Sequence, residues 1–159
     1  MNWHRLLSRR ATEGRPLRVA LIGAGKFGSM FLAQARRTAG IHVVAVVDLA
    51  PQHAHDSLAR VGWGAERSAA RSIADADEHG TTCILDDPLA AISSGEIEIV
   101  IEATGSPAAG IRHALACCAH GKHLIMVTVE ADALAGPLLA RRAAQAGIVY
   151  SLAYGDSPR

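Results

Sequence analysis

Three glycines near the amino end of the chain restrict the folds that it can adopt. They follow the apolar residues 19–22 and precede a helical pattern, and a second apolar run, residues 43–47, ends at Asp48. A strand, a glycine loop, a helix, a second strand and an acid about twenty residues past the last glycine are the fingerprint of a dinucleotide-binding βαβ unit. The spacing is G-x-G-x-x-G, and the glycines are Gly23, Gly25 and Gly28. We therefore predict a dinucleotide site; a glycine-rich turn that binds nothing is the alternative.

Each residue of this loop has its own physical reason. Gly23 is expected to make the tight turn after the strand, where a Cβ would clash. Gly25 leaves room for a pyrophosphate to approach the backbone, and Gly28 lets the helix pack closely on the strand. Lys26 and Phe27 open the helix, whose free N–H groups and dipole favour phosphate. We assign all five residues to cofactor binding.

The acid at the end of the second run bears on the choice of cofactor. Asp48 is expected to accept two hydrogen bonds from a ribose diol. Its carboxylate would repel a 2′-phosphate, and residues 49–53 contain no arginine that could bind one. These residues therefore favour NAD over NADP.

The rest of the chain alternates between strand-type and helix-type patterns. The 159 residues are enough for one domain with a real core. The alternation predicts an α/β fold: a doubly wound parallel sheet of about six strands in the order 3-2-1-4-5-6, the Rossmann fold. One helix, residues 107–120, is expected to carry Ile111, Leu115 and Cys118 inward. We expect strands over residues 19–22, 43–47, 82–85, 97–101, 124–127 and 148–151, and helices over 26–38, 51–60, 68–78, 88–95, 107–120 and 136–145.

Residues 1–16 are expected to form a separate segment before a dinucleotide-binding domain at residues 17–159. The segment carries four arginines and a single acid, Glu13. We expect an amphipathic leader helix; a targeting peptide is the alternative, because such peptides are rich in arginine and poor in acids. The helix would pack three apolar side chains on the domain: Trp3, Leu6 and Leu7.

Two further pairs of residues fall at the ends of predicted strands. Thr104 and Gly105 follow the fourth strand, and Thr128 and Glu130 follow the fifth. In a doubly wound sheet this edge faces the nicotinamide half of a dinucleotide. We assign all four to cofactor binding, although Glu130 could equally cap a short segment before Gly136.

Composition excludes several classes of partner. The net charge of +1 gives no argument for binding nucleic acid or a membrane surface, and no apolar run approaches membrane-spanning length. Three cysteines without a C-x-x-C pair favour a reducing cytoplasm. His53 and His55 would point to different faces of a helix, so we expect no metal site there. The partner that remains is a small-molecule substrate, and a homo-oligomer is compatible with the sequence.

Six segments carry a resemblance to a known family. They are residues 18–31, 100–105, 110–115, 120–123, 127–132 and 150–156. In these segments the chain resembles the nucleotide-binding domain of the homoserine dehydrogenase-like oxidoreductases, and within them the group similar to 1-deoxy-D-xylulose 5-phosphate reductoisomerase. The resemblance implies hydride transfer to or from a small carbonyl or hydroxy substrate, with NADP(H) as the cofactor.

Two departures limit what the resemblance implies. Its relatives carry an Asn-Lys pair where this chain reads Thr128-Val129-Glu130, so their exact chemistry does not transfer. They also continue into a substrate domain that we expect to be absent from this chain. The main hypothesis is therefore the cofactor-binding part of an NAD(P)-dependent oxidoreductase that a C-terminal domain completes. The alternative is a regulatory module that senses a dinucleotide without turnover.

Overall fold

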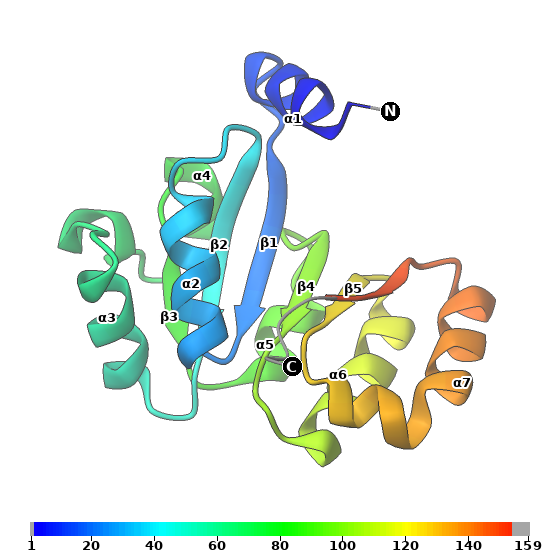
Figure 1. Ribbon diagram of the computed structural model, residues 1–159. Helices are drawn as coiled ribbons and strands as arrows, with labels where there is room; N and C mark the ends of the chain where they lie inside the picture. Colours follow the sequence, from blue (N-terminus) through cyan, green and yellow to red (C-terminus); the bar gives the residue numbers. More distant parts are fainter. Residues whose placement is uncertain (1, 154–159) are drawn as a thin grey trace.

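Six parallel strands form one sheet, in which the third strand of the chain lies at one edge and the sixth at the other (Figure 1). The structure is a computed structural model and describes residues 2–153. The strand order is 3-2-1-4-5-6, so the predicted doubly wound sheet is confirmed. The strands are β1 (Leu17–Ile22), β2 (Ile41–Val47), β3 (Cys83–Leu85), β4 (Ile99–Glu102), β5 (His123–Met126) and β6 (Tyr150–Leu152).

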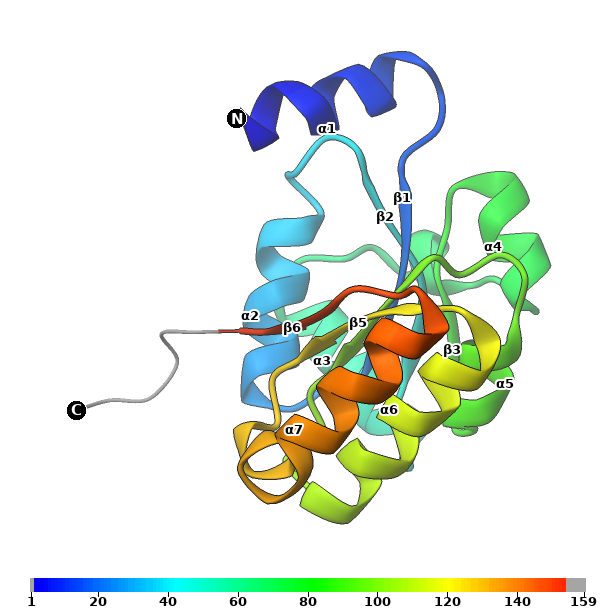
Figure 2. The ribbon, with the colours of Figure 1, turned by 90° about the vertical axis from the view of Figure 1, so that its right-hand side faces the viewer.

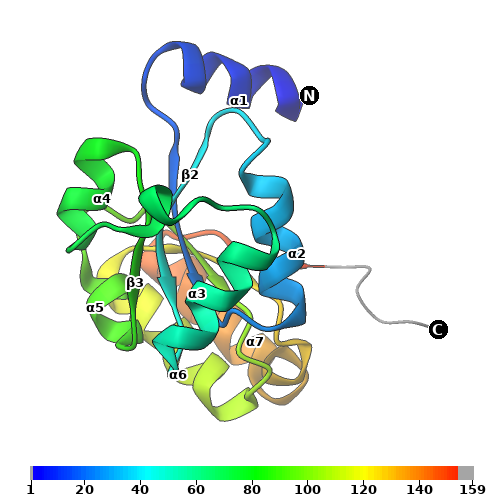
Figure 3. The ribbon, with the colours of Figure 1, turned by 90° about the vertical axis from the view of Figure 1, so that its left-hand side faces the viewer.

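Helices cover both faces of this sheet (Figures 2 and 3). On one face lie α2 (Lys26–Ala35) and α3 (Pro51–Arg60), followed by the short 3-10 helix η1 (Ala65–Ser68). The other face is covered by four helices, which are α4 (Ile73–His79), α5 (Pro88–Ser93), α6 (Pro107–His120) and α7 (Val129–Ala146).

The two layers of helices enclose two hydrophobic cores, one on each face of the sheet. Successive side chains of a strand point to opposite faces. In β1, Val19 and Leu21 therefore enter the core beneath α2 and α3, whereas Ala20 and Ile22 enter the other. Continuous apolar strands of this kind are typical of a parallel sheet that helices cover on both sides.

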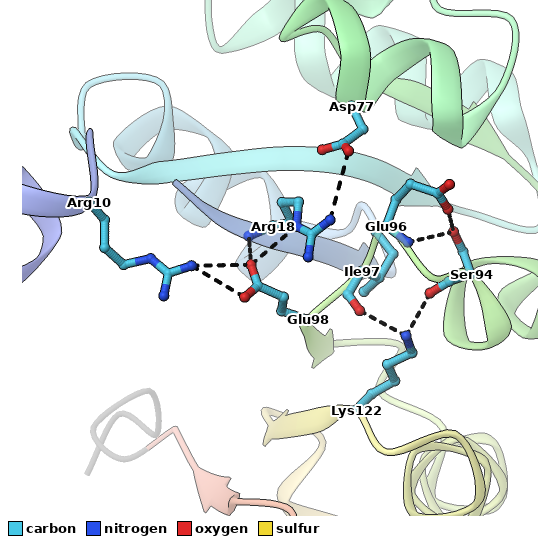
Figure 4. Close-up of polar contacts among 8 residues, drawn as sticks. All are labelled: Arg10, Arg18, Asp77, Ser94, Glu96, Ile97, Glu98 and Lys122. Carbon is cyan, nitrogen blue, oxygen red and sulfur yellow. Dashed lines mark hydrogen bonds and ion pairs between the residues drawn. The ribbon is translucent and has the colours of Figure 1, made fainter. Parts of the chain in front are cut away.

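An acid just before β4 holds the amino end of the sheet together (Figure 4). Glu98 accepts hydrogen bonds from Arg10 Nη2 at 3.2 Å and from Arg18 Nε at 3.3 Å. Arg10 lies on helix α1 (Trp3–Thr12), so this pair ties that helix to the sheet. Burial alone would raise the pKa of Glu98, but the bonds from Arg18 and the charge of Arg10 lower it below its usual value.

A buried lysine completes this edge (Figure 4). Lys122, immediately before β5, is 8% exposed. Its Nζ donates to the carbonyl of Ser94 at 2.6 Å and to that of Ile97 at 2.8 Å. The ammonium group thereby fixes the loop between α5 and β4 against β5.

The structure corrects three predictions about the helices. Trp3 is 69% exposed, so its predicted packing on the domain is wrong. Helix α1 instead contacts the loop before β2, where the backbone of Leu7 lies against Gly40. Helix α7 starts at Val129, not at residue 136, and runs through Pro137. Leu115 on α6 is exposed; the buried face of that helix consists of Gly110, His113, Ala114 and Cys117.

We expect Lys122→Met to lower the free energy of unfolding by about 1–3 kcal/mol, because it removes the ammonium donor from the buried carbonyl of Ile97 and from the partly buried carbonyl of Ser94. Urea unfolding followed by circular dichroism measures the change. Lys26 is exposed and is the other lysine of the chain, so Lys26→Met is the matched control and should change stability by less than about 0.5 kcal/mol. Equal effects of the two substitutions would contradict a role for the buried ammonium group.

Candidate functional site

The glycine loop lies at the carboxyl end of β1, where it is crowded by its neighbours. Gly23 has φ of 99°, and a Cβ there would lie 2.5 Å from the carbonyl oxygen of Ala103. A Cβ on Gly28 would overlap the carbonyl oxygen of Gly23. Both positions therefore require glycine for the steric reasons predicted from the sequence.

The middle glycine has the opposite environment. Apart from Gly25 itself and its two neighbours in the chain, no atom of residues 2–153 lies within 4 Å of the position that a Cβ of Gly25 would occupy. Gly25 is the N-cap of α2, and because it has no side chain it makes no capping hydrogen bond to the helix. Lys26 and Phe27 form the first turn, where backbone N–H groups lack intrahelical partners. This combination leaves an open, electropositive position at the N-terminus of α2.

Asp48 follows β2 and closes onto the glycine loop. Its Oδ2 accepts from the backbone N–H of Ala24 at 3.2 Å and lies 3.0 Å from Nδ1 of His53, which is on α3. Its Oδ1 accepts from the N–H of Ala50 at 3.0 Å. Burial alone would raise the pKa of Asp48, but these hydrogen bonds lower it below its usual value.

These contacts limit what Asp48 can offer a ribose. Each carboxylate oxygen accepts about two hydrogen bonds. Oδ2 already has two partners, in Ala24 and His53, and Oδ1 has one. Two hydrogen bonds from a ribose diol, as predicted, therefore require His53 to give up its contact, whereas a single bond to Oδ1 does not.

A fully buried acid lies beneath the neighbouring rim. Glu102, the last residue of β4, is 0% exposed. Its Oε1 accepts from Thr104 Oγ1 at 2.6 Å and lies 3.2 Å from Nδ1 of His113. The hydroxyl of Thr128 donates to the other oxygen, Oε2. Burial alone would raise the pKa of Glu102, but the bonds from His113 and the two threonines lower it, so the side chain is a carboxylate at neutral pH.

The same contacts occupy the two threonines that we assigned to the cofactor. Both hydroxyl hydrogens point to Glu102, so neither hydroxyl is free to donate to a ligand. Thr104 Oγ1 also accepts from the N–H of Ser106 at 3.2 Å, and Thr128 Oγ1 from that of Gly105 at 3.1 Å. The threonines thus shape the rim and hold the turn at Gly105, whose φ is 71°.

Two cavities open along this edge of the sheet. The larger, a groove of about 570 Å³, contains Gly23, Asp48 and Thr104 in its lining. The smaller, about 250 Å³, is lined by a second set of the predicted residues, which are Phe27, Gly105, Thr128 and Glu130. Gly25, Lys26 and Gly28 line neither cavity. The glycine loop thus lies between a groove at the end of β2 and a cavity at the end of β5.

Glu130 belongs to the first turn of α7 and is exposed. The alternative that it caps a segment before Gly136 is wrong, because that segment is already part of the helix. A further cavity of about 850 Å³ lies at the opposite edge, among Arg10, Arg18 and Glu98. That cavity does not touch the glycine loop.

The sequence analysis did not identify four residues that line the groove. It also did not identify the buried acid Glu102 as part of the site. Leu49 and Leu89 are exposed apolar residues of the lining, and Arg112 and His113 reach it from α6. Glu102 carried the clearest signal, because it is a charged residue at the end of an otherwise apolar strand. His113 could have been found from its spacing of seven residues from Ser106, which places both on one face of α6.

Residues 17–127 match the model of a protein family described as an oxidoreductase family with an NAD-binding Rossmann fold. No curated protein matches the chain at a significant level. No helix within residues 2–153 has the length and apolar character that are needed to cross a membrane.

Solved structures share the fold at low identity. An NAD binding oxidoreductase from Klebsiella pneumoniae is 20% identical, with a TM-score of 0.63, and a homoserine dehydrogenase from Thiobacillus denitrificans is 20% identical, with a TM-score of 0.67. The WlbA dehydrogenase from Chromobacterium violaceum, solved with NADH and UDP-GlcNAcA, is 17% identical, with a TM-score of 0.65. The matches cover 87% of this chain but 34%, 29% and 35% of the three others, so this chain spans about a third of their length.

We expect Glu102→Gln to lower the free energy of unfolding by about 1–3 kcal/mol at pH 7, because the amide replaces a carboxylate that three donors hold. The folded-state pKa of Glu102 is lowered, so its contribution is present above the unfolded pKa of about 4.3 and is lost as the pH falls through the folded value. The difference between the two proteins should therefore shrink in acid. Urea titrations between pH 3 and pH 7 measure it.

The matched control for this experiment is Glu130→Gln, because Glu130 is exposed. It should leave stability within about 0.5 kcal/mol of the original at each pH. A Glu102→Gln effect that stays constant across the titration would contradict a stabilising carboxylate.

Proposed function

The chain belongs to the oxidoreductase family with an NAD-binding Rossmann fold, and from this membership we propose that it holds a nicotinamide dinucleotide across the carboxyl edge of its sheet for hydride transfer. The observation that carries the proposal is the glycine loop. Two of its glycines are fixed by crowding, whereas Gly25 faces open space at the start of α2. A position that no side chain fills, next to unpaired helical N–H groups, suits a pyrophosphate.

The residues on either side of the loop suit the two halves of the cofactor. We place the adenosine half in the groove beside Asp48, whose Oδ1 can accept from a ribose hydroxyl. We place the nicotinamide half toward the smaller cavity, which Phe27, Gly105 and Glu130 line. The hydride chemistry belongs to the nicotinamide, and these residues bind and orient it.

The substrate in this proposal is a small carbonyl or hydroxy compound that reaches the smaller cavity. The WlbA dehydrogenase, which is similar in fold, was solved with UDP-GlcNAcA as well as NADH, and this supports a small-molecule substrate beside the cofactor. Hydride transfer requires substrate held against the nicotinamide ring, and positioning supplies about 7–11 kcal/mol of the barrier. We propose that a further domain holds the substrate against the nicotinamide, as the resemblance implies.

Within the family we propose a relationship to the homoserine dehydrogenase-like enzymes, including the reductoisomerase-like group. The segments around Glu102 and Glu130 support it, as does the structural likeness to a homoserine dehydrogenase. Thr128-Val129-Glu130 still replaces the Asn-Lys pair of those enzymes. The acid–base group of the reaction must therefore differ from theirs.

We further propose a reducing, cytoplasmic setting. Cys83, Cys117 and Cys118 are free thiols. Burial raises the pKa of Cys117 to about 12, which keeps that thiol protonated and unreactive at neutral pH.

The first test of this function is Gly25→Val. The branched side chain would occupy the open position at the N-terminus of α2, so NAD binding should fall below detection in calorimetric titration. Gly95→Val is the matched control, because a Cβ at Gly95 also meets no atom within 4 Å but lies in the loop before β4. The control should bind as the original does. Unchanged binding by a folded Gly25→Val protein would refute the pyrophosphate position.

The second test concerns NAD against NADP. Asp48 favours NAD, while the resemblance implies NADP(H). Loss of a charged acceptor costs about 1.5–3 kcal/mol, so Asp48→Ala should weaken NAD binding by roughly tenfold to a hundredfold and narrow its preference over NADP. Asp86→Ala removes the same charge from an exposed position nearby and should leave the ratio unchanged. If Asp48→Ala also leaves the NAD/NADP affinity ratio unchanged, the carboxylate does not face the ribose.

A further inference from the structure

His113 is almost completely buried, yet one of its ring nitrogens has no hydrogen-bond partner in the part of the chain that the structure describes. The residue is 7% exposed and lies on the inner face of α6. Nδ1 lies 3.2 Å from Oε1 of Glu102. Nε2 has no hydrogen-bond partner among residues 2–153, is not sealed from solvent, and His113 lines the groove beside Asp48.

Glu102 determines which nitrogen of this ring carries the hydrogen. The lowered pKa of Glu102 makes it a carboxylate, and a carboxylate can only accept hydrogen bonds. Nδ1 must therefore be the donor of the pair. In a neutral imidazole the other nitrogen is then an acceptor. When the ring is neutral, the groove thus contains a hydrogen-bond acceptor at Nε2.

The rest of the groove suits a flat apolar group. Leu49 follows β2 and is 87% exposed, and Leu89 lies in the first turn of α5 and is 57% exposed. Pro88 and Ala109 add further apolar surface. Large exposed apolar side chains around a groove with a few polar atoms are the usual environment of a ligand ring.

We propose that His113 is a specificity-determining residue that reads the base of the bound dinucleotide, with Nε2 accepting a hydrogen bond from the exocyclic amino group of adenine. The inference rests on the proposed function and extends it to a residue outside the glycine loop. Asp48 at the groove marks the ribose, so the group that enters between Leu49 and Leu89 is the base.

Position separates this role from catalysis. His113 does not line the smaller cavity, where Thr128 and Glu130 mark the nicotinamide half. His113 is therefore a binding residue, and Glu102 is a positioning residue that acts through it. An acceptor that is left unpaired in a groove of this kind costs affinity, so a base that lacks the amino group should bind less well.

The test compares NAD with nicotinamide hypoxanthine dinucleotide, in which a carbonyl replaces the amino group. Calorimetric titration of the original protein should show NAD binding about tenfold more tightly. His113→Leu should abolish the preference, since it removes the acceptor while filling similar space. His113→Gln places an amide oxygen near the position of Nε2 and should restore part of it.

Two further variants separate reading of the base from a structural effect. Glu102→Gln no longer fixes the tautomer and should reduce the preference for NAD without abolishing binding of either dinucleotide. His120→Leu alters an exposed histidine at the end of the same helix and should leave the ratio unchanged. Melting temperatures identify any variant that fails to fold. If His113→Leu fails to fold, His113→Gln decides the outcome.

The outcomes distinguish this inference from the function on which it rests. If neither dinucleotide binds the original protein, both are overturned. If NAD binds but the original protein shows no preference over the hypoxanthine analogue, or if the folded His113 variants keep the original ratio, the role of His113 alone is refuted.

Discussion

A carboxylate with no exposure to solvent holds together the part of the molecule where the strands end. Moving an isolated charge into a protein interior is costly, and it persists only where donors replace water. Glu102 receives those donors from three places: Thr104 just past its own strand, His113 on α6 and Thr128 at the start of α7. Because each partner lies on a different element, satisfying this one side chain fixes the relative positions of β4, α6 and α7.

Close packing around Glu102 shows how little freedom the arrangement leaves. A Cβ on Gly110 would lie 2.9 Å from the Cβ of Ala131 and 3.4 Å from Oε2 of Glu102. The glycine therefore lets α6 and α7 approach each other above the carboxylate. The small residues where α6 crosses α7 and the hydrogen bonds to the Glu102 carboxylate beneath them hold the two helices in the same relative position. Both therefore shape the rim that faces the proposed nicotinamide position.

The carboxyl edge contains a second acid, Asp48, whose carboxylate oxygens already accept most of the hydrogen bonds they can from the protein itself. Asp48 accepts from the backbone of Ala24 and so ties the end of β2 to the glycine loop. The side chains at this edge thus mostly bond one another, and few of their polar atoms are left for a ligand. Among the described residues, those that remain include the backbone N–H groups of α2, Oδ1 of Asp48, Nε2 of His113 and the exposed side chains of Arg112 and Glu130. Recognition of a dinucleotide would therefore depend on backbone N–H groups and shape together with these few side-chain atoms.

The sequence by itself determined the glycine loop, the alternation of strands and helices, the strand order and the position of Asp48 at the end of β2. These features follow from local rules: steric demands on single glycines, continuous apolar runs and the handedness of crossovers. Only the tertiary structure decided that Glu102 bonds His113 and Thr128, that His53 bonds Asp48, and that Lys122 is buried against Ser94 and Ile97. Each of these pairs joins residues from different elements, and their meeting depends on how helices pack on the sheet. The start of α7 at Val129 and the inward face of α6 were decided in the same way, because the burial of whole helices outweighed the local signals of Pro137 and Leu115.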